Sequence, residues 1–433
     1  MFYRISQTLW GDISGEEAKK FGLLSGIFFF IVGAYWMLRE LKDALLMHFV
    51  GTQGIPYAKM ISLVSIVLIL LFYNKLVDLF EKTHLVYIVA TFYGVLYLSI
   101  AYLLTLPTIG MANTVTSPYR ILGWVTYVAI EAFGSIVVSL FWAYVASIMD
   151  NASARRGYPV ILAGAQFGTI LGSILTMTMA TRIGVPVLFA IAAMAVLCVP
   201  VMMKIFTLCY PAPENVVQEK KASTGILEGL RLILSKPYLM GILVVSTIYE
   251  IISFLIEYQM KVCAKQTLGA TEKVVEFMGL QGLLVNGLAF AFALVGTSFF
   301  IRKFGLRTCL ILYPSMIACL VLFAWNLPSL YVFLACVVAI KALSYTLNGP
   351  CKEIMYIPTS KDVKFKAKSW IDAVGGRSSK GIGATIGAFF PVMSELLFFG
   401  SIISLGVIAA WIPIAWYVGT TNRKLVQDNK IIE

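Results

Sequence analysis

Residues 121–148 read ILGWVTYVAIEAFGSIVVSLFWAYVASI, and Glu131 is the sole charged side chain in this stretch. A helix crosses the roughly 30 Å hydrocarbon core of a bilayer with about 17–25 residues, so this run is long enough to span a membrane. Runs of the same kind recur along the whole chain. The sequence predicts about twelve such helices, at residues 21–38, 60–77, 84–106, 121–148, 158–181, 183–207, 238–260, 277–301, 308–326, 328–348, 381–397 and 399–418.

Composition gives the same class of protein. The 433 residues are 59% hydrophobic and 13% charged, and the mean hydropathy is +0.86. A soluble domain of this length would need more polar surface than these residues supply. Backbone groups find no water inside lipid, so long apolar segments satisfy their own hydrogen bonds as helices. The predicted fold class is an all-α polytopic membrane protein.

The distribution of Lys and Arg predicts the orientation. Residues 1–20 contain Asp12, Glu16 and Glu17 and no apolar core, which is not typical of a cleaved signal, so we expect the first helix to be retained. With both termini in the cytoplasm, inside segments hold 25 Lys and Arg and outside loops hold 8. This ratio favours cytoplasmic termini and twelve spans.

A polar stretch at 208–237 divides the chain into an N-terminal six-helix half, 1–207, and a C-terminal six-helix half, 238–433. This cytoplasmic linker includes a short amphipathic segment, Ile226 to Leu234. Charged landmarks recur at similar places in both halves, an arrangement that resembles the parallel repeats of the major facilitator superfamily. That architecture has its substrate site between the halves, near the midplane.

Ionisable residues inside spans are costly and therefore mark functional sites. Glu131 lies mid-span, although it could pair with a lysine only to hold two helices together. Glu250 and Glu257 lie two turns apart on one face of the seventh helix. Lys261 follows Glu257 at i+4, so a local ion pair is the alternative there.

Cations complete the pattern. Lys341 lies deep in the tenth predicted helix and needs a carboxylate or an anionic ligand, unless it extends to the membrane surface. Arg39, Lys42 and Asp43 occupy the outer end of the first helix, where an ordinary interfacial cap is the alternative. These charges gather on helices one, four, seven and ten. Such a mixed lining suits a strongly anionic substrate with other polar parts.

Several other classes of site are excluded by the residues themselves. His48 and His84 are far apart and the seven cysteines are scattered singly, so neither zinc nor haem chemistry is expected and no cofactor is predicted. Positive charge is dispersed over many loops, which argues against a nucleic-acid partner. Residues 375–381 lack the spacing of a phosphate-binding loop.

Six stretches, in order, resemble the nucleotide transporters, or ATP/ADP translocases, of obligate intracellular bacteria and plastids. They are Glu17-Ala-Lys-Lys-Phe, Arg39-x-x-Lys42-Asp43, Ile55-Pro56-x-x-Lys59, Glu131 with Phe141-Trp142 and Arg156-x-Tyr158, Glu257-x-x-x-Lys261 with Phe277-Met278-Gly279, and Cys351-Lys352-Glu353 through Ile371-Asp372. The last stretch, rich in lysine, is the most distinctive.

The resemblance implies exchange or import of nucleotides across a bacterial inner membrane, by alternating access and without chemical change, so no enzyme is expected. It places substrate contacts at Lys42, Glu131, Glu257 and Lys352. Arg39 and Lys261 are further substrate candidates. Gating or coupling candidates are Asp43, Glu250, Lys341, Arg155, Arg156 and Glu353.

The chain departs from the family pattern in two places. Ala143-Tyr-Val-Ala-Ser147 lacks an Asn that usually follows Phe-Trp, and Thr359-Ser360-Lys361-Asp362 replaces an acidic pair. ATP/ADP exchange as such is therefore open, and uptake of another organic phosphate or anion on the same fold, with proton coupling, is the alternative. A membrane-embedded enzyme, a lipid scramblase or a purely structural protein fits less well. The expected partners are the nucleotide and the lipid bilayer, with no obligate protein partner.

Overall fold

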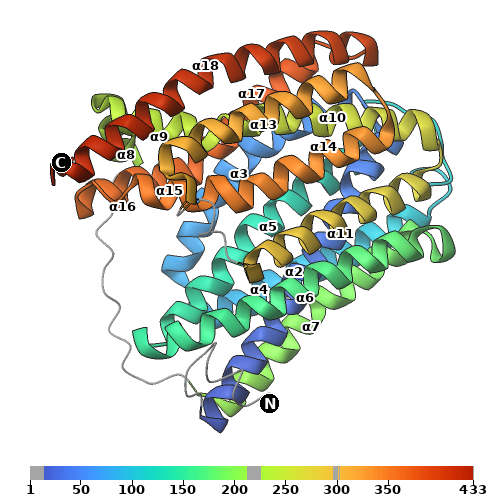
Figure 1. Cartoon of the computed structure of the whole chain (residues 1–433). Helices are drawn as coiled ribbons and strands as arrows, with labels where there is room; N and C mark the ends of the chain where they lie inside the picture. The colour runs from blue at the N-terminus through green and yellow to red at the C-terminus, as the bar shows by residue number, and fades with distance from the viewer. Residues whose placement is uncertain (1–13, 212–225, 296–300, 302, 433) are drawn as a thin grey trace. The chain divides into compact units, whose positions relative to one another are not determined.

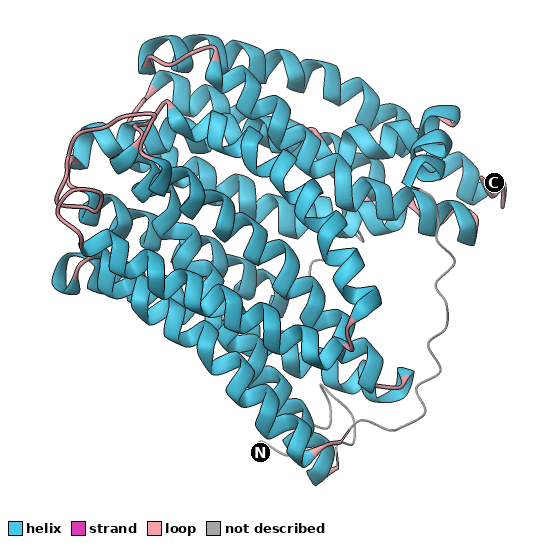
Figure 2. Ribbon diagram, turned by 180° about the vertical axis from the view of Figure 1, so that it is seen from behind, coloured by secondary structure: helices cyan, strands magenta, loops and turns pink. Residues whose placement is uncertain are grey.

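The computed structural model of the chain describes residues 14–211, 226–295, 301 and 303–432, and every regular element within them is helical (Figures 1 and 2). The predicted start of the chain before Ser14 and the linker residues 212–225 lie outside the described residues. Contacts group the chain into two compact units, each described by itself below. Unit 1 comprises Met1–Gly54, Ile61–Glu219 and Leu268–Asn286, and unit 2 comprises Ile55–Met60, Lys220–Thr267 and Gly287–Glu433. The predicted domain boundaries stay a prediction.

The chain before the linker forms long helices joined by short turns. These helices are α2 (Gly15–Phe49), α3 (Gly54–Leu79), α4 (Lys82–Thr105), α5 (Ile121–Ile148), α6 (Asn151–Ile183) and α7 (Val185–Cys209). In unit 1, α2 packs against α5, α6 and α7, and α4 packs against α5 and α7. Figure 1 shows α2 running alongside α6 and α7.

Glycines explain how closely α2 and α6 approach. A Cβ on Gly168 of α6 would lie 2.5 Å from the carbonyl oxygen of Phe29, and one on Gly33 of α2 would lie 3.1 Å from the carbonyl oxygen of Gly168. The close approach extends along α6, because a Cβ on Gly164 would collide with Ser25 and one on Gly172 would lie 2.7 Å from the carbonyl oxygen of Gly33.

The second part of the chain contains more broken helices. They are α8 (Ile226–Ser235), α9 (Pro237–Thr247), α10 (Tyr249–Leu268), α11 (Thr271–Val295), α13 (Leu306–Asn326), α14 (Leu330–Leu343), η1 (Ser344–Asn348), α15 (Gly349–Met355), α16 (Lys361–Trp370), η2 (Ile371–Gly375), α17 (Gly376–Ala388) and α18 (Met393–Gln427). The segments η1 and η2 are π-helical turns inside longer helical runs. In unit 2, α18 packs on α13 and α9, while α8 packs on α16.

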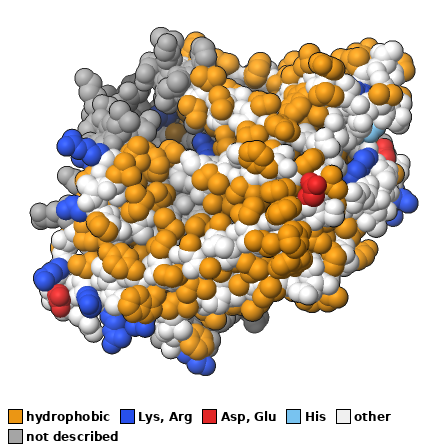
Figure 3. Space-filling model, turned by 90° about the horizontal axis from the view of Figure 1, so that it is seen from above, with side chains coloured by type: hydrophobic (Ala, Val, Ile, Leu, Met, Phe, Trp, Pro, Cys, Tyr) orange, Lys and Arg blue, Asp and Glu red, His pale blue; other side chains and the backbone are white. Residues whose placement is uncertain are grey.

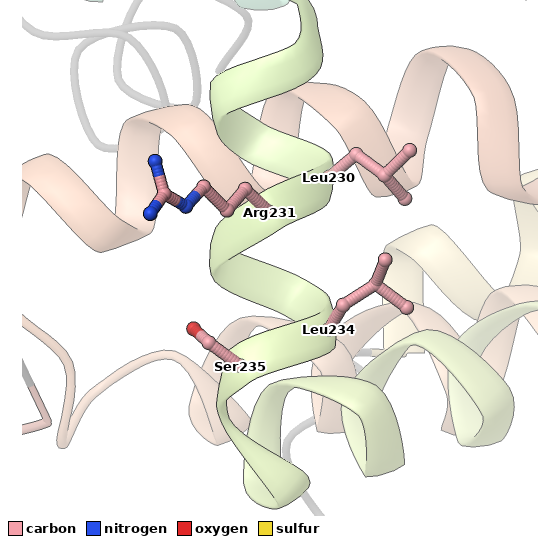
Figure 4. Close-up of a pocket in the computed structure, with 4 residues that line it drawn as sticks. All are labelled: Leu230, Arg231, Leu234 and Ser235. Atoms are coloured by element: carbon pink, nitrogen blue, oxygen red, sulfur yellow. The ribbon is translucent and has the colours of Figure 1, made fainter.

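Helix α8 occupies the segment for which the sequence predicts an amphipathic helix. Figure 4 shows Leu230 and Leu234 on one side of this helix and Arg231 and Ser235 on the other. Its Gly229 faces α16, because a Cβ there would lie 2.7 Å from the carbonyl oxygen of Lys366. The close contact fixes α8 against the lysine-rich helix.

Ten helices within the described residues are long and apolar enough to cross a membrane. Many large apolar side chains on them face outward, such as Phe92 of α4 and Val201 of α7, each 60% exposed. Hydrophobic side chains cover much of the face in Figure 3. An exterior of this kind is buried by lipid, so the chain is a multi-pass membrane protein.

Three predicted boundaries differ from the structure. Helix α2 continues to Phe49, so Arg39, Lys42 and Asp43 lie within it and do not form an interfacial cap. The run that begins at Leu330 continues through η1 to Met355, and helix resumes at Lys361. The predicted helix over 381–397 is instead divided, because α17 ends at Ala388 and α18 begins at Met393.

Candidate functional site

Lys42 is the centre of a buried charge cluster in unit 1. Its Nζ lies 3.2 Å from Oδ1 of Asp43 and 3.1 Å from Oε1 of Glu131, and 4.1 Å from the centre of the Tyr127 ring. Lys42 is 4% exposed and Asp43 6%. These four residues, called the Lys42 cluster, surround one cation with two carboxylates and an aromatic face.

Aromatic packing sets the relative position of α2 and α5 at this cluster. The rings of Phe28 and Phe141 stack with their centres 4.5 Å apart. The Tyr35 ring lies over Gly134, where a Cβ would collide with it. One turn further along α2, Arg39 stacks over the Trp36 ring at 4.5 Å. The aromatic contacts therefore hold Lys42 opposite Glu131.

A second charge cluster lies in unit 2, around Glu257 of α10. Oε1 of Glu257 accepts a hydrogen bond from Nζ of Lys261 at 2.8 Å, and Oε2 lies 3.8 Å from Nζ of Lys341 in α14. Both lysine side chains are largely buried. These three residues, called the Glu257 cluster, contain the i+4 pair expected as the local alternative and also the cation of the tenth predicted helix.

Glu250 forms a separate contact near the start of α10. Its Oε1 accepts a hydrogen bond from the Tyr249 hydroxyl at 2.8 Å and lies 3.3 Å from Nζ of Lys380 in α17. Glu250 and Glu257 therefore share a helix but have different lysine partners. Two carboxylates of one face thus connect α10 to two different helices.

The lysine-rich stretch contains two further pairs. Lys352, in the last turn of α15, pairs with Asp372 in η2. Glu353 accepts hydrogen bonds from Nζ of Lys368 at 2.7 Å to each carboxylate oxygen. These side chains are more exposed than those of the two clusters. They connect the helical runs before and after the turn at 356–360.

The two arginines predicted for gating lie at the start of α6. Arg155 is exposed, whereas Arg156 forms an ion pair of 2.5 Å with Glu17 of α2. Arg156 thus joins the N-terminal turns of α2 and α6. The structure does not bring either residue into the Lys42 cluster.

Three polar residues of these sites were not selected from the sequence, namely Tyr127, Asp372 and Lys380, and neither was the buried Glu40 outside them. Glu40 lies inside α2, and the rule that selected Glu131 would have selected it if the helix had been extended past residue 38. Tyr127 lies one turn before Glu131 on α5, a spacing that places both on one face. Asp372 ends the last stretch that resembles the family, but its pairing with Lys352, like that of Lys380 with Glu250, depends on tertiary contacts.

No group of three or more His, Cys, Asp or Glu side chains suited to a metal ion occurs within the described ranges. The Lys42 and Glu257 clusters consist instead of ion pairs between lysines and carboxylates. A lysine between carboxylates can exchange those partners for the oxygens of an anion, and an aromatic face can stack on a planar group.

Comparison with known proteins adds the family. The sequence pattern of the TLC ATP/ADP transporter family matches residues 1–117, 119–327 and 327–422. The chain belongs to the TLC ATP/ADP transporter family. It is therefore a carrier and not an enzyme, in agreement with the resemblance found in the sequence.

Relatives of this TLC transporter extend over nearly its whole length. It is 22% identical over 499 residues to "ADP,ATP carrier protein 3" of Rickettsia bellii (strain RML369-C), with 98% of each chain covered. It is 26% identical over 475 residues to "ADP,ATP carrier protein 2, chloroplastic" of Arabidopsis thaliana, covering 95% of this chain and 76% of the plant protein.

Solved structures confirm the fold class of the TLC transporter. A mutant of the nucleoside transporter NupG superposes with a TM-score of 0.66 at 13% identity, covering 92% of this chain and 99% of the other. At that identity the likeness shows the fold alone, which is the predicted major-facilitator-like one.

Proposed function

We propose that the protein carries nucleotides across a bacterial inner membrane by alternating access, either exchanging ATP for ADP or importing nucleotide, with both termini in the cytoplasm. The observation that carries the proposal is the Lys42 cluster. It holds a lysine inside a membrane-spanning helix by ion pairs that an anionic substrate can replace. The names of the relatives, ADP,ATP carrier proteins, support a nucleotide as that anion.

The proposed role of Lys42 follows from its partners. A buried cation with two carboxylates is stable without substrate, and a phosphate group offers it a stronger and more highly charged partner. Substrate binding would then release Glu131 from Lys42. The buried Tyr127 ring faces the ammonium group and helps to hold the cation in place.

The Glu257 cluster suits the opposite role. Here one carboxylate serves two lysines, so the three residues have an excess of positive charge. Lys261 and Lys341 can hold phosphates, while Glu257 can accept hydrogen bonds from a ribose or an exocyclic amine. In the proposal Glu257 orders the nucleoside part, and its release from Lys341 accompanies substrate binding.

Lys352 is proposed as a phosphate contact that is reached from water. Its pair with Asp372 is partly exposed, so the pair stabilises the fold little and is replaced easily. Asp43, Glu250, Lys380 and Glu353 are proposed to take part in gating or coupling, as positioning residues, and Arg39 is proposed as a further substrate contact.

Counterflow in proteoliposomes tests the substrate. Liposomes loaded with unlabelled ATP are given labelled ATP, ADP, GTP or another nucleotide, and a parallel set receives labelled sugar phosphates. We expect uptake of at least one nucleotide that depends on internal nucleotide or on a proton gradient. Uptake confined to other organic phosphates would instead identify the carrier of a different anion, and no uptake at all would refute the proposal.

A variant series tests the residues. Lys352→Ala should raise the nucleotide concentration needed for half-maximal uptake without lowering the unfolding temperature, because its ion pair is partly exposed. Lys204→Ala is the matched control, since Lys204 is exposed on α7. Equal transport by both variants would remove Lys352 from the site.

A further inference from the structure

Glu40 is a buried carboxylate that the two clusters do not use. It lies in α2, is 5% exposed, and its Oε1 accepts a hydrogen bond of 2.6 Å from Oγ of Ser173 in α6. Its Oε2 is buried and has no hydrogen-bond partner among the described residues. No lysine, arginine or histidine forms a described ion pair with it.

The surroundings of Glu40 come from two other helices. Helix α6 contributes Ser173 and Thr176, both fully buried, and the Thr176 hydroxyl donates to the carbonyl oxygen of Gly172 at 3.0 Å. Helix α11 contributes Gly282, where a Cβ would lie 2.7 Å from Oγ of Ser173 and would collide with the Glu40 carboxyl group. The carboxyl group is therefore enclosed by small side chains, without room for a large partner.

Nearby charged groups form no described ion pair with the Glu40 carboxyl group, although the neighbouring Arg39 attracts it through space. Arg39 is the neighbouring residue on α2, and its guanidinium stacks over Trp36. Lys42 pairs with Asp43 and with Glu131 of α5, whereas Glu40 contacts Ser173 of α6. On α11, Glu276 lies nearly two turns from Gly282 and accepts a hydrogen bond from Thr181. Glu40 thus lacks the paired cation that stabilises each carboxylate of the clusters.

An ionised carboxylate that is buried without a paired cation is unstable, and such a group takes up a proton instead. The neutral form fits the observed contacts. As a neutral carbonyl oxygen, Oε1 can still accept the hydrogen bond from Ser173 while Oε2 carries the proton, and an O–H group without an acceptor costs far less than an unmet negative charge.

We propose that Glu40 is a proton-binding site, protonated while enclosed by Ser173 and Gly282 and deprotonated when water reaches it. The step is Glu40–COOH to Glu40–COO⁻ with the proton passing to water, so no other reactant is needed. A sodium ion is a poorer occupant, since it requires several oxygen ligands and the carboxyl group is closely enclosed by Ser173 and Gly282. As a coupling site for transport, the inference rests on the proposed function, but proton binding itself does not.

Infrared difference spectroscopy tests proton binding without transport. Purified protein in lipid nanodiscs is titrated with alkali, and the carbonyl stretching band of protonated carboxyl groups is followed. We expect wild type to have a band that is absent in Glu40→Gln, present in the control Glu276→Gln, and shifted in frequency in Ser173→Ala. If Glu40→Gln does not fold, the frequency shift in Ser173→Ala alone shows whether the band belongs to Glu40. The same spectrum in wild type and Glu40→Gln would overturn the proposal, as would a sodium-dependent change at constant pH.

Transport then tests coupling. Wild-type uptake of nucleotide should be stimulated by an inward proton gradient, and Glu40→Gln should retain uptake but lose this stimulation. Stimulation that survives in Glu40→Gln would refute the coupling role. If wild type binds the proton at Glu40 but moves no nucleotide, the proposed function fails and the proton site stands.

Discussion

Nζ of Lys42 lies 3.1 Å from Oε1 of Glu131, so an ion pair inside the membrane-spanning region joins α2 to α5. The pair explains how α2 continues as a helix through Arg39-Glu-Leu-Lys-Asp43. Charges that would otherwise end a span are neutralised by partners on α2 itself and on α5.

The first prediction concerns the stability of this pair. Lys42→Ala leaves the Glu131 and Asp43 carboxylates buried without their cation, a loss of about 3–5 kcal/mol for such sites. The double variant Lys42→Ala/Glu131→Gln should recover part of the loss. Thermal unfolding in detergent measures both. If the double variant is less stable than Lys42→Ala by the full effect of Glu131→Gln alone, the two side chains do not interact.

The pair of Lys42 and Glu131 either only holds two helices together or takes part in substrate binding. Nucleotide transport by Lys42→Ala and by the double variant distinguishes these two roles. If the pair only holds two helices together, the stabilised double variant should regain transport as well as stability. If Lys42 contacts the substrate, stability returns and transport does not. Counterflow of labelled nucleotide decides between these outcomes.

The second prediction concerns Glu257, whose carboxylate contacts both Lys261 and Lys341. Lys341→Gln leaves Glu257 paired with Lys261 at 2.8 Å, so the unfolding temperature should fall only slightly. Glu257→Gln removes the partner of two buried lysines and should destabilise by roughly 3–5 kcal/mol. Thermal unfolding of both variants gives the comparison, and the reverse order would contradict the described geometry.

The third prediction concerns the glycine contact between α2 and α6. Gly168→Val should destabilise the protein strongly, because even a Cβ at Gly168 lies 2.5 Å from the carbonyl oxygen of Phe29. Gly22→Ala on α2 is the control, since a Cβ there has no neighbour within 4 Å. That change should be neutral or stabilise by up to about 1 kcal/mol through helix propensity. Similar behaviour of the two variants would exclude close packing as the reason for Gly168.

The fourth prediction concerns Arg120, which closes the connection between α4 and α5. Its guanidinium donates to the carbonyl oxygens of Ile109 at 2.9 Å, Gly110 at 2.8 Å, Asn113 at 2.7 Å and Val115 at 3.1 Å. An ammonium group cannot match this planar fork, so Arg120→Lys should speed amide hydrogen exchange over 106–117. Arg182→Lys, at an exposed arginine, is the control and should leave that exchange unchanged.

The sequence predicted the helical class because apolar runs of membrane-spanning length are a strong and local signal. Helix ends were less accessible, since whether residues 39–49 continue α2 depends on Glu131, which is distant in sequence. The start of α16 was also difficult to predict from the sequence. Its lysines suggest a loop, but Ser360 caps the helix by accepting a hydrogen bond from the amide of Val363, and α8 packs against it.

Candidate site residues were found one by one from the sequence, but apart from the i+4 pair of Glu257 and Lys261 their partners were not predicted. The free-energy cost of placing a charged side chain inside a membrane span was enough to identify Glu131, Glu257 and Lys341 from the sequence. The choice of partner depends on tertiary packing, and so Lys380 beside Glu250 and Ser173 beside Glu40 were unforeseen. Glu40 was missed because its neighbours in sequence are charged, although its neighbours in space are not.

The π-helical turn η1 changes which residues share a face in the run from Leu330 to Met355. Lys341 and Lys352 are eleven residues apart, a spacing that would align them in an uninterrupted α-helix. A π-turn accommodates an extra residue and rotates everything after it by about 100°, and the two lysines accordingly have different partners, Glu257 and Asp372. Chemical labelling of single cysteines along this run should therefore show two periodic patterns that are out of phase across 344–348. A helical wheel drawn over the whole run would therefore misplace the residues of α15, which follow the π-turn.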